Sequence, residues 1–411
     1  NKQDILEQAD ETDAMFGELY SWYLRNPEYR SRVQKLVQSA FAGKPEDIIS
    51  QSVAKALYGE VSPYSATRLE RFAACAFAHF LQYGMKLTER VEYEFKPMDM
   101  GNVMHEALES FAEEVRKRGM KWTELTEQER NEIADRCLDN IVADYGNTVL
   151  KSSARNEYMI ERTRRILRRT VWALQKQLEQ GEFQPEGFEV TFGGGRIDRV
   201  DIMEDQNKVY VKVIDYKTGN TSFDLVYLYH GLQLQLMIYL DGALRVEQKK
   251  YPDKEIIPAG VFYYNIKDPM IQEQIDADVE AVSAGLMKEL KMNGLVQADP
   301  ELVYRMDSSL GSIPVAFNKD GSFRKNSSVA DRTQFAVLGR YVRTKIEKIR
   351  SSILEGDAEV SPYELGKKNA CTYCPYMTVC GFDRRLSGYE FRRLKNFSDE
   401  ELWKAFDREA E

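Results

Sequence analysis

The sequence predicts an α/β fold: a central mixed sheet flanked by helices and enlarged by long helical insertions. Two observations support this. The segment from Phe188 to Gly219 alternates, is rich in β-branched residues and contains the polar stretch Glu204-Asp205-Gln206-Asn207, which indicates a β-hairpin preceded by a further strand. A helix at 225–244 and a strand at 259–265 should follow, because the pattern changes from helical to strand-like. Together these elements form one α/β core.

Most of the remaining chain has helical periodicity. Helices are expected at 66–81, 101–118, 126–145, 156–179, 276–292 and 330–355. We therefore divide the chain into four parts. They are a helical lead-in from an upstream region (1–60), a core with a helical insert at about 120–180 (61–270), a helical region (271–360) and a cysteine-bearing tail (361–411).

Composition narrows the class of protein. Of the 411 residues, 43% are hydrophobic and 30% are charged, which is typical of a globular protein and excludes disorder of the whole chain. There is neither a signal-peptide pattern nor a run of about 20 apolar residues, so we expect an intracellular protein without a membrane partner. The net charge of −9 argues against a general polyanion binder but leaves room for a local basic groove. The first residue is Asn1 rather than Met, which suggests a piece of a longer protein.

The hairpin brings two carboxylates together. Its register can be tested by centring the turn between residues 206 and 207 and requiring apolar residues to face one another. This register gives the pairs Val200 with Val213, Ile202 with Val211, and Asp198 with Asp215. Lys217 lies one pleat further on the same face. Two carboxylates and an ammonium are therefore expected at the end of an apolar face.

Such a cluster suits a hard divalent cation. Carboxylates within about 5 Å repel each other unless a cation lies between them, and oxygen ligands favour Mg²⁺, or Mn²⁺ in its place. The metal would polarise a phosphoryl oxygen, and the lysine would orient or deprotonate an attacking water. An isolated D-x-K is more often a pair of ordinary strand-end charges. The surrounding sequence therefore has to decide between such charges and a metal site.

Four segments supply that context. They are Gly101-Asn102-Val103-Met104-His105, Gly195-Arg196-Ile197-Asp198-Arg199-Val200-Asp201, Ile214-Asp215-Tyr216-Lys217-Thr218-Gly219 and Gln235-Leu236-Met237-Ile238-Tyr239. In this order they resemble the G-x-x-x-H, G-x-x-D-R-x-D, D-Y-K-T-G and Q-L-x-x-Y motifs of the RecB-like branch of the PD-(D/E)xK nuclease superfamily. The resemblance covers residues 101–239 and implies a restriction-endonuclease-like core.

The resemblance also implies roles for individual residues. Asp198 and Asp215 would bind the metal together with the main-chain carbonyl of Tyr216. Lys217 would position the attacking water. His105, one of three histidines, would lie next to the metal, although a lone helical histidine is ordinarily a core or surface residue.

Three further residues are less specific. Gln235 and Tyr239 lie four apart and share a helix face, so the resemblance implies that both reach the scissile phosphate or the catalytic lysine. On their own they would be ordinary residues of an amphipathic helix. Glu189 precedes the hairpin and could reach the metal, but an outward-facing strand glutamate is at least as plausible.

Three cysteines in the tail have the spacing of metal ligands, Cys371-x2-Cys374-x5-Cys380, but a zinc or iron-sulfur site usually needs four. The sequence around Cys75 resembles the first helix of the AddB family of AddAB helicase-nuclease subunits, with Ala76 where that family usually has proline. The resemblance implies that Cys75 completes a 4Fe-4S cluster. A zinc site and four unliganded thiols remain as alternatives.

The remaining cysteine, Cys137, is expected to be a small buried residue of a helix. A ligand set that spans nearly the whole chain would act as a clasp between the tail and the helix before the core. Its loss should loosen the domain without directly touching the hydrolytic residues.

Two basic groups are candidates for DNA contact. The first lies on one helix and includes Arg162, Arg165 and Arg169; the second, beyond the cysteines, includes Arg384 and Arg385. Such groups neutralise phosphates, but solvated helix faces look the same in sequence.

These observations predict a metal-dependent DNA exonuclease domain of an AddAB-type helicase-nuclease, which resects double-strand ends for recombinational repair. The resemblance implies an AddA-like partner subunit, a single strand from a duplex end as substrate, and the bacterial cytoplasm. No G-x-x-x-x-G-K-[ST] motif occurs, so ATP hydrolysis is not expected of this chain. The alternatives are another RecB-like iron-sulfur nuclease, of CRISPR-adaptation or replication-associated type, and a non-catalytic DNA-end-binding module.

Overall fold

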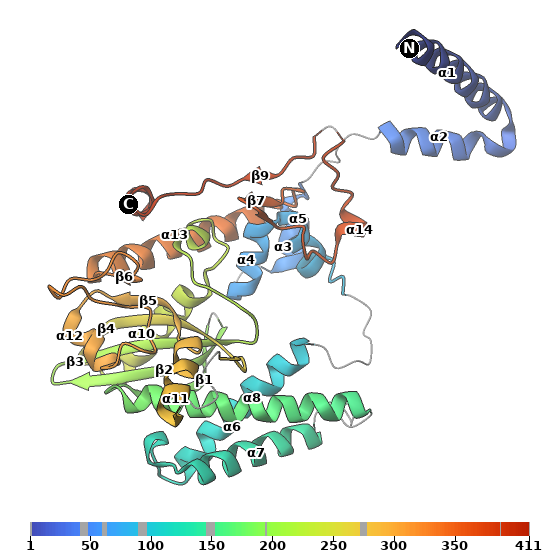
Figure 1. The fold of residues 1–411 in the computed structure, drawn as a ribbon. Coiled ribbons are helices and arrows are strands. Elements are labelled where there is room, and N and C mark those ends of the chain that lie inside the picture. Colours follow the sequence, from blue (N-terminus) through green and yellow to red (C-terminus); the bar gives the residue numbers. More distant parts are fainter. Residues whose placement is uncertain are drawn as a thin grey trace.

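The fold is centred on a six-stranded mixed sheet between two layers of helices (Figure 1). The computed structural model describes residues 2–41, 48–59, 64–88, 97–144, 153–193, 195–271, 278–386 and 388–410. No helix within these ranges is long and apolar enough to cross a membrane.

The sheet follows the order of the chain. Its strands are β1 (Gln184–Phe192), β2 (Gly195–Asp205), β3 (Lys208–Lys217), β4 (Glu255–Asn265), β5 (Asn293–Gln297) and β6 (Val329–Ala330). Strands β1 to β3 are antiparallel neighbours, whereas β3 and β4 are parallel and need a helical crossover between them. That crossover carries part of the candidate site.

The predicted hairpin register is confirmed. Val200 pairs with Val213 and Ile202 with Val211, and the two-residue turn includes Gln206 with a φ of 42°. A positive φ at this position matches the right-handed twist of the two strands and fixes their register. The ladder continues to Arg199 opposite Ile214, so Asp198 and Asp215 come next at its end.

One layer of helices covers one face of the sheet. It consists of α6 (Pro97–Lys117), α7 (Glu127–Asp144) and α8 (Ala154–Glu179), seen below the sheet in Figure 1. The side chains of Ile214 and Tyr216 lie in the same core as these helices. Helices α7 and α8 lie in the predicted helical insert, and α6 corresponds to the helix expected at 101–118.

A second core lies on the opposite face. Its helices are α4 (Ala66–Ala74), α10 (Gln235–Lys250), α13 (Arg332–Glu355) and α15 (Asp399–Ala410). Val211 and Val213 belong to this core, as the strand alternation requires. Residues 215 and 217 continue the same face to the end of β3.

The other helices either add buried residues to these two cores or lie outside them. They are α1 (Lys2–Arg25), α2 (Pro27–Phe41), α3 (Gln51–Tyr58), α5 (Ala76–His79), the π-helix Phe80–Gly84, the 3₁₀ turn Trp122–Glu124, α9 (Leu225–Tyr229), α11 (Val279–Glu289), α12 (Pro300–Met306) and α14 (Met377–Cys380). A small sheet in the tail consists of β7 (Tyr363–Leu365), β8 (Lys368–Asn369) and β9 (Arg392–Arg393).

Three elements differ from the sequence prediction. The expected helix at 225–244 is interrupted between α9 and α10, where Gly231 has a φ of +78°. The expected helix at 66–81 is interrupted at Cys75, whose φ of −166° is extended. The region 271–360 is not wholly helical, because it also contributes β5 and β6 to the sheet. These two strands have 5 and 2 residues, too short for alternation to reveal them.

Candidate active site

Asp198 of β2 and Asp215 of β3 are both buried and lie close to each other. Asp198 accepts a hydrogen bond from the main-chain N–H of Tyr216 at 2.7 Å, which ties its carboxylate to β3. Asp215 is 1% exposed. Burial, together with the charge of Asp198, raises the pKa of Asp215 to about 7, although Lys217 opposes the shift. The structure thus brings the predicted carboxylate pair together.

A chain of polar contacts leads from Asp215 to helix α10. Lys217 Nζ lies 2.6 Å from Asp215 Oδ2 and donates to Gln235 Oε1 at 2.8 Å. The side-chain amide of Gln235 in turn donates to the hydroxyl of Tyr239 at 2.9 Å. Residues 235 and 239 lie one helical turn apart, so both point toward the lysine from α10. The predicted lysine, glutamine and tyrosine therefore form one connected group.

Helix α6 contributes His105 from the other side of Asp198. Its Nδ1 lies 3.4 Å from Asp198 Oδ2 and 3.8 Å from Glu189 Oε1. Burial by itself would lower the pKa of His105, but the two carboxylates outweigh burial and raise the pKa to about 10. Ligand atoms of His105, Glu189 and Asp198 lie within 4.8 Å of one another, and this group could hold a metal ion.

Glu189 faces the site because the alternation of side chains along β1 is interrupted at this residue. Its φ of 49° is in the left-handed region, which is rare for a residue with a side chain. Phe188 packs against the core of α6 to α8, whereas Val190 packs against the opposite core. The strained residue between them points its carboxylate inward, with a side-chain exposure of 7%. The outward-facing alternative for Glu189 is therefore wrong, and strain of this kind is typical of functional sites.

Comparison with known proteins agrees with this geometry. The family described as the PD-(D/E)XK nuclease superfamily matches residues 63–381. The chain belongs to the PD-(D/E)XK nuclease superfamily. Its relatives include proteins named as a subunit of an ATP-dependent helicase/deoxyribonuclease. That of Lachnoclostridium phytofermentans is 41% identical over 98% of this chain and 36% of the relative. Those of Thermoanaerobacter sp. and Clostridium acetobutylicum are 34% and 33% identical, over 98% and 97% of this chain and 37% and 36% of the relatives. The chain thus spans little more than a third of the length of these curated relatives.

The donor set of this PD-(D/E)XK nuclease fits a hard divalent metal. Carboxylate oxygens from two neighbouring strands face an imidazole nitrogen from α6. Magnesium and manganese prefer oxygen ligands, and an imidazole is acceptable to manganese. The hydrogen bond from the main-chain N–H of Tyr216 holds the carboxylate of Asp198 in position before a metal binds. The ligand role of the Tyr216 carbonyl stays a prediction.

A cluster of buried charged side chains lies on the face of β2 opposite to Asp198. Arg199 and Asp201 form a two-bonded ion pair at 2.5 and 2.9 Å, and Lys212 Nζ lies 2.9 Å from the same carboxylate. Asp201 is fully buried, and the guanidinium lies near the rings of Trp122 and Phe188. Arg199 and Asp201 belong to the G-x-x-D-R-x-D motif, yet the sequence assigned them no role. The alternation of β2 could have placed both on the opposite face from Asp198.

The four predicted cluster cysteines lie close together. Cys75, between α4 and α5, is packed in a small core with Tyr376 and Cys374. Burial and the neighbouring Cys75, Cys374 and Cys380 raise the pKa of Cys371 to about 11. Cys75 and the other two tail cysteines are thus electrostatic neighbours of Cys371, although Cys75 lies nearly 300 residues before them. Cys137 lies in another core, within α7.

The predicted DNA-contacting arginines have mixed surroundings. In α8, Arg162 is exposed, Arg165 Nε pairs with Asp268 at 2.6 Å, and Arg169 lies 5.2 Å from the centre of the Trp172 ring. Asp268 follows the end of β4, which is also the end of the sheet that carries Lys217. In the tail, Arg384 lies over the ring of Phe391, 5.6 Å from its centre. Arg385 is paired with Asp383 at 2.5 Å.

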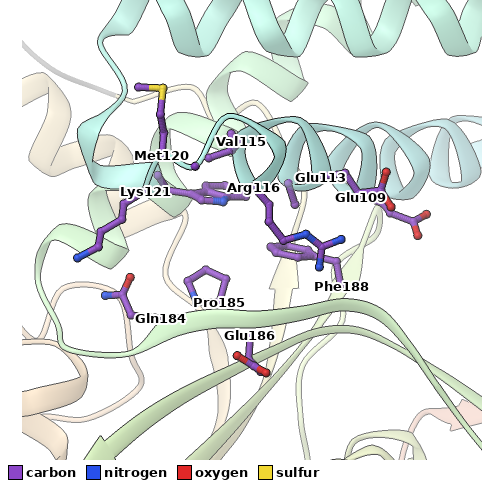
Figure 2. Close-up of a pocket in the computed structure, with 13 residues that line it drawn as sticks. Glu109, Glu113, Val115, Arg116, Met120, Lys121, Gln184, Pro185, Glu186 and Phe188 are labelled. Atoms are coloured by element: carbon purple, nitrogen blue, oxygen red, sulfur yellow. The ribbon is translucent and has the colours of Figure 1, made fainter.

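A separate pocket of about 280 Å³ lies between α6 and β1 (Figure 2). Glu109 and Glu113 line it from the helix, and Pro185 and Glu186 line it from the strand. None of the predicted catalytic residues is among its lining residues. The pocket therefore neighbours the metal-binding group without being part of it.

Proposed function

We propose that this chain is the metal-dependent DNA exonuclease domain of an AddAB-type helicase-nuclease, acting in double-strand-break end resection. The observation that carries the proposal is the position of Lys217. Its ammonium is held between Asp215 and Gln235, beside the group formed by His105, Glu189 and Asp198. The names of the relatives, which combine helicase and deoxyribonuclease, support the choice of DNA as substrate.

The residues divide the hydrolytic work between them. Asp198, Asp215, Glu189 and His105 would hold the metal, which when bound polarises a phosphoryl oxygen and stabilises the leaving group. Lys217 has three N–H donors, of which Asp215 and Gln235 take two. The third can hold the attacking water and aim its oxygen at the phosphorus. Gln235 and Tyr239 keep the ammonium in this position.

The test is Mg²⁺-dependent degradation of linear DNA by the full-length subunit in its complex. Asp215→Ala should remove the cleavage assigned to this domain and leave DNA binding intact. Asp253→Ala, which changes an exposed aspartate in the loop after α10, is the matched control and should behave like wild type. Equal cleavage by wild type and Asp215→Ala would falsify the nuclease assignment.

The second part of the proposal is a 4Fe-4S cluster held by Cys75, Cys371, Cys374 and Cys380. It is supported by the position of Cys75, Cys374 and Cys380 as neighbours of Cys371 and by the burial of Cys75. Anaerobically purified protein should contain about four iron atoms and four sulfides per chain. Cys371→Ser should lose this iron and melt at a lower temperature, whereas Cys137→Ser should keep it. Stoichiometric zinc in place of iron would overturn the cluster.

The names of the same relatives and the motif resemblance support the wider setting that we propose. We assign an AddA-like helicase-nuclease subunit as partner, a single strand from a duplex end as substrate, and the bacterial cytoplasm as location. The exposed face of α8 with Arg162, Arg165 and Arg169 is the first candidate for the DNA path, because Arg165 lies at the active-site end of the sheet. Arg384 and Arg385 are the second.

A further inference from the structure

Helix α10 begins without a cap of its own. Its N-cap position is Leu234, a buried leucine whose side chain cannot accept a hydrogen bond. Helix starts normally carry Ser, Thr, Asp or Asn there, because the first N–H groups otherwise lack acceptors. The preceding Gln233 cannot help, since its amide is engaged with Ser222 and Asp224. The missing acceptor has to come from elsewhere in the chain.

Glu70, on α4, supplies it. Its Oε1 accepts from the N–H of Leu234 at 2.7 Å and from the N–H of Gln235 at 2.9 Å. The two partners lie 164 and 165 residues further along the chain. A carboxylate is also the favoured group at a helix N-terminus, where the macrodipole is positive. One side chain thus replaces the local cap of the helix that carries Gln235 and Tyr239.

The position of α4 against this helix start is well defined. The loop before α10 passes so close that a Cβ atom on Gly231 would lie 3.2 Å from the Cβ of Ala73. The tail holds α4 from the other side, because Arg392 donates a side-chain hydrogen bond to the carbonyl of Ala73. Ser65 caps the start of α4. The helix that presents Glu70 is therefore fixed on several sides.

The capped residue is the one that holds the lysine. Gln235 is the first residue of α10, and its side-chain oxygen accepts from Lys217 Nζ at 2.8 Å. A shift of the first turn would move that oxygen, and with it the ammonium beside Asp215. Displacements of about 1 Å in a catalytic group can cost about 100-fold in rate.

We infer that Glu70 is a positioning residue: by accepting both N–H groups at the start of α10, it fixes Gln235 and through it Lys217. The inference rests on the nuclease function proposed above. It assigns to Glu70 the geometry of an acceptor and neither metal binding nor proton transfer. It also connects the cysteine-bearing end of α4 with the hydrolytic residues, since Cys75 is the C-cap of the helix that carries Glu70.

The experiment compares two near-isosteric substitutions in the full-length complex. Glu70→Gln keeps an oxygen acceptor and removes the charge, whereas Glu70→Met keeps the length and removes the acceptor. Cleavage of linear DNA with Mg²⁺ is measured as kcat and KM, after subtracting the rate of the Asp215→Ala complex. Asp331→Ala is the control for a merely structural role, because Asp331 also accepts a main-chain N–H at a helix start, that of α13. Its neighbour Arg332 pairs with Glu255 at the start of β4, whereas Lys217 lies beside the end of β4.

We expect Glu70→Met to lower kcat about tenfold or more with little change in KM. Glu70→Gln should stay within about threefold of wild type, and Asp331→Ala should keep kcat even if its melting temperature falls as far as that of Glu70→Met. The inference is overturned if Glu70→Met keeps the wild-type kcat, if Glu70→Gln is as impaired as Glu70→Met, or if Asp331→Ala loses kcat equally. If Asp215→Ala itself retains wild-type cleavage, the proposed function fails instead, so the two failures are distinguishable.

Discussion

Lys217 Nζ lies 2.8 Å from Gln235 Oε1, and this hydrogen bond joins the strand with the catalytic aspartate to helix α10. Lys217 is the last residue of β3, and Gln235 is the first residue of α10, the second helix of the crossover from β3 to β4. The ammonium is therefore positioned from two sides: by a carboxylate on its own strand and by an amide on α10. Each side can be tested separately.

Gln235→Leu should lower kcat about 10- to 100-fold, because the lysine loses its acceptor and gains freedom to move. Tyr239→Phe removes only the hydroxyl behind the glutamine and should cost about 2- to 10-fold, the value of one ordinary hydrogen bond. Both are measured on linear DNA with Mg²⁺. Gln248→Leu, at an exposed position of the same helix, should retain the wild-type rate. A larger loss for Tyr239→Phe than for Gln235→Leu would contradict the proposed order of contacts, in which Gln235 binds Lys217 and Tyr239 binds Gln235.

Glu189→Ala should raise the Mg²⁺ concentration needed for half-maximal cleavage about tenfold or more, since changes around metal sites have effects of this size. The direct measurement is Mn²⁺ binding by calorimetry in the absence of DNA, comparing Glu189→Ala with the wild type. Glu186→Ala tests the same substitution three residues earlier in β1, where the carboxylate is exposed and pairs with Lys250. Identical metal requirements for Glu189→Ala and wild type would remove Glu189 from the metal-binding group.

The sequence sufficed to predict the parts of the site that lie on regular elements. Asp198 and Asp215 follow from the hairpin register, since apolar pairs and a two-residue turn allow one alignment. Gln235 and Tyr239 follow from the resemblance to the Q-L-x-x-Y motif, since helical spacing alone only puts them on one helix face. Glu189 stayed undecided between the metal and an outward face, because strand alternation assumes negative φ and its left-handed backbone reverses the face it occupies. If residues are paired outward from the turn, starting with Phe192 opposite Gly195, Glu189 falls opposite Asp198.

Glu70 escaped for a different reason. Its partners are main-chain N–H groups more than 160 residues away, and no local pattern encodes such a contact. The one available signal was the absence of a capping residue before Gln235. The strands β5 and β6 were missed because so few residues form them, and their pairing depends on the edge that β4 presents.

The buried cluster beneath the site gives a stability prediction. Asp201→Asn would leave Arg199 and Lys212 as two buried cations without the carboxylate that pairs with both of them. Breaking a buried ion pair from one side typically costs about 3–5 kcal/mol. Chemical denaturation should show a loss of this size. Asp205→Asn, on the same strand but in a partly exposed pair with Arg305, should cost about 0–1 kcal/mol. Comparable losses for the two variants would show that the cluster is not a buried ionic unit.

His79 provides a pH-dependent prediction. The ring is fully buried near Tyr58, Phe72 and Tyr83, and its Nε2 accepts from Arg68 Nε at 3.1 Å. Burial, and to a lesser extent Arg68, lower its pKa to about 3 in the folded chain. An unfolded histidine has a pKa of about 6.5, so between these values the unfolded chain binds a proton that the folded chain does not. Stability should therefore decline as the pH falls below about 6.5, by about 1.4 kcal/mol per pH unit from this residue.

The check is a comparison of wild type with His79→Gln by denaturation from pH 7.5 to 5. The glutamine can still accept from Arg68 but does not titrate. By pH 5 the wild type should have lost about 2 kcal/mol more than the variant, relative to their values at pH 7.5. Other titrating groups and the four cysteines are common to both proteins, so their effects cancel in the difference. Parallel stability curves would mean that His79 is protonated in the folded chain, in which case Arg68 could not donate to it.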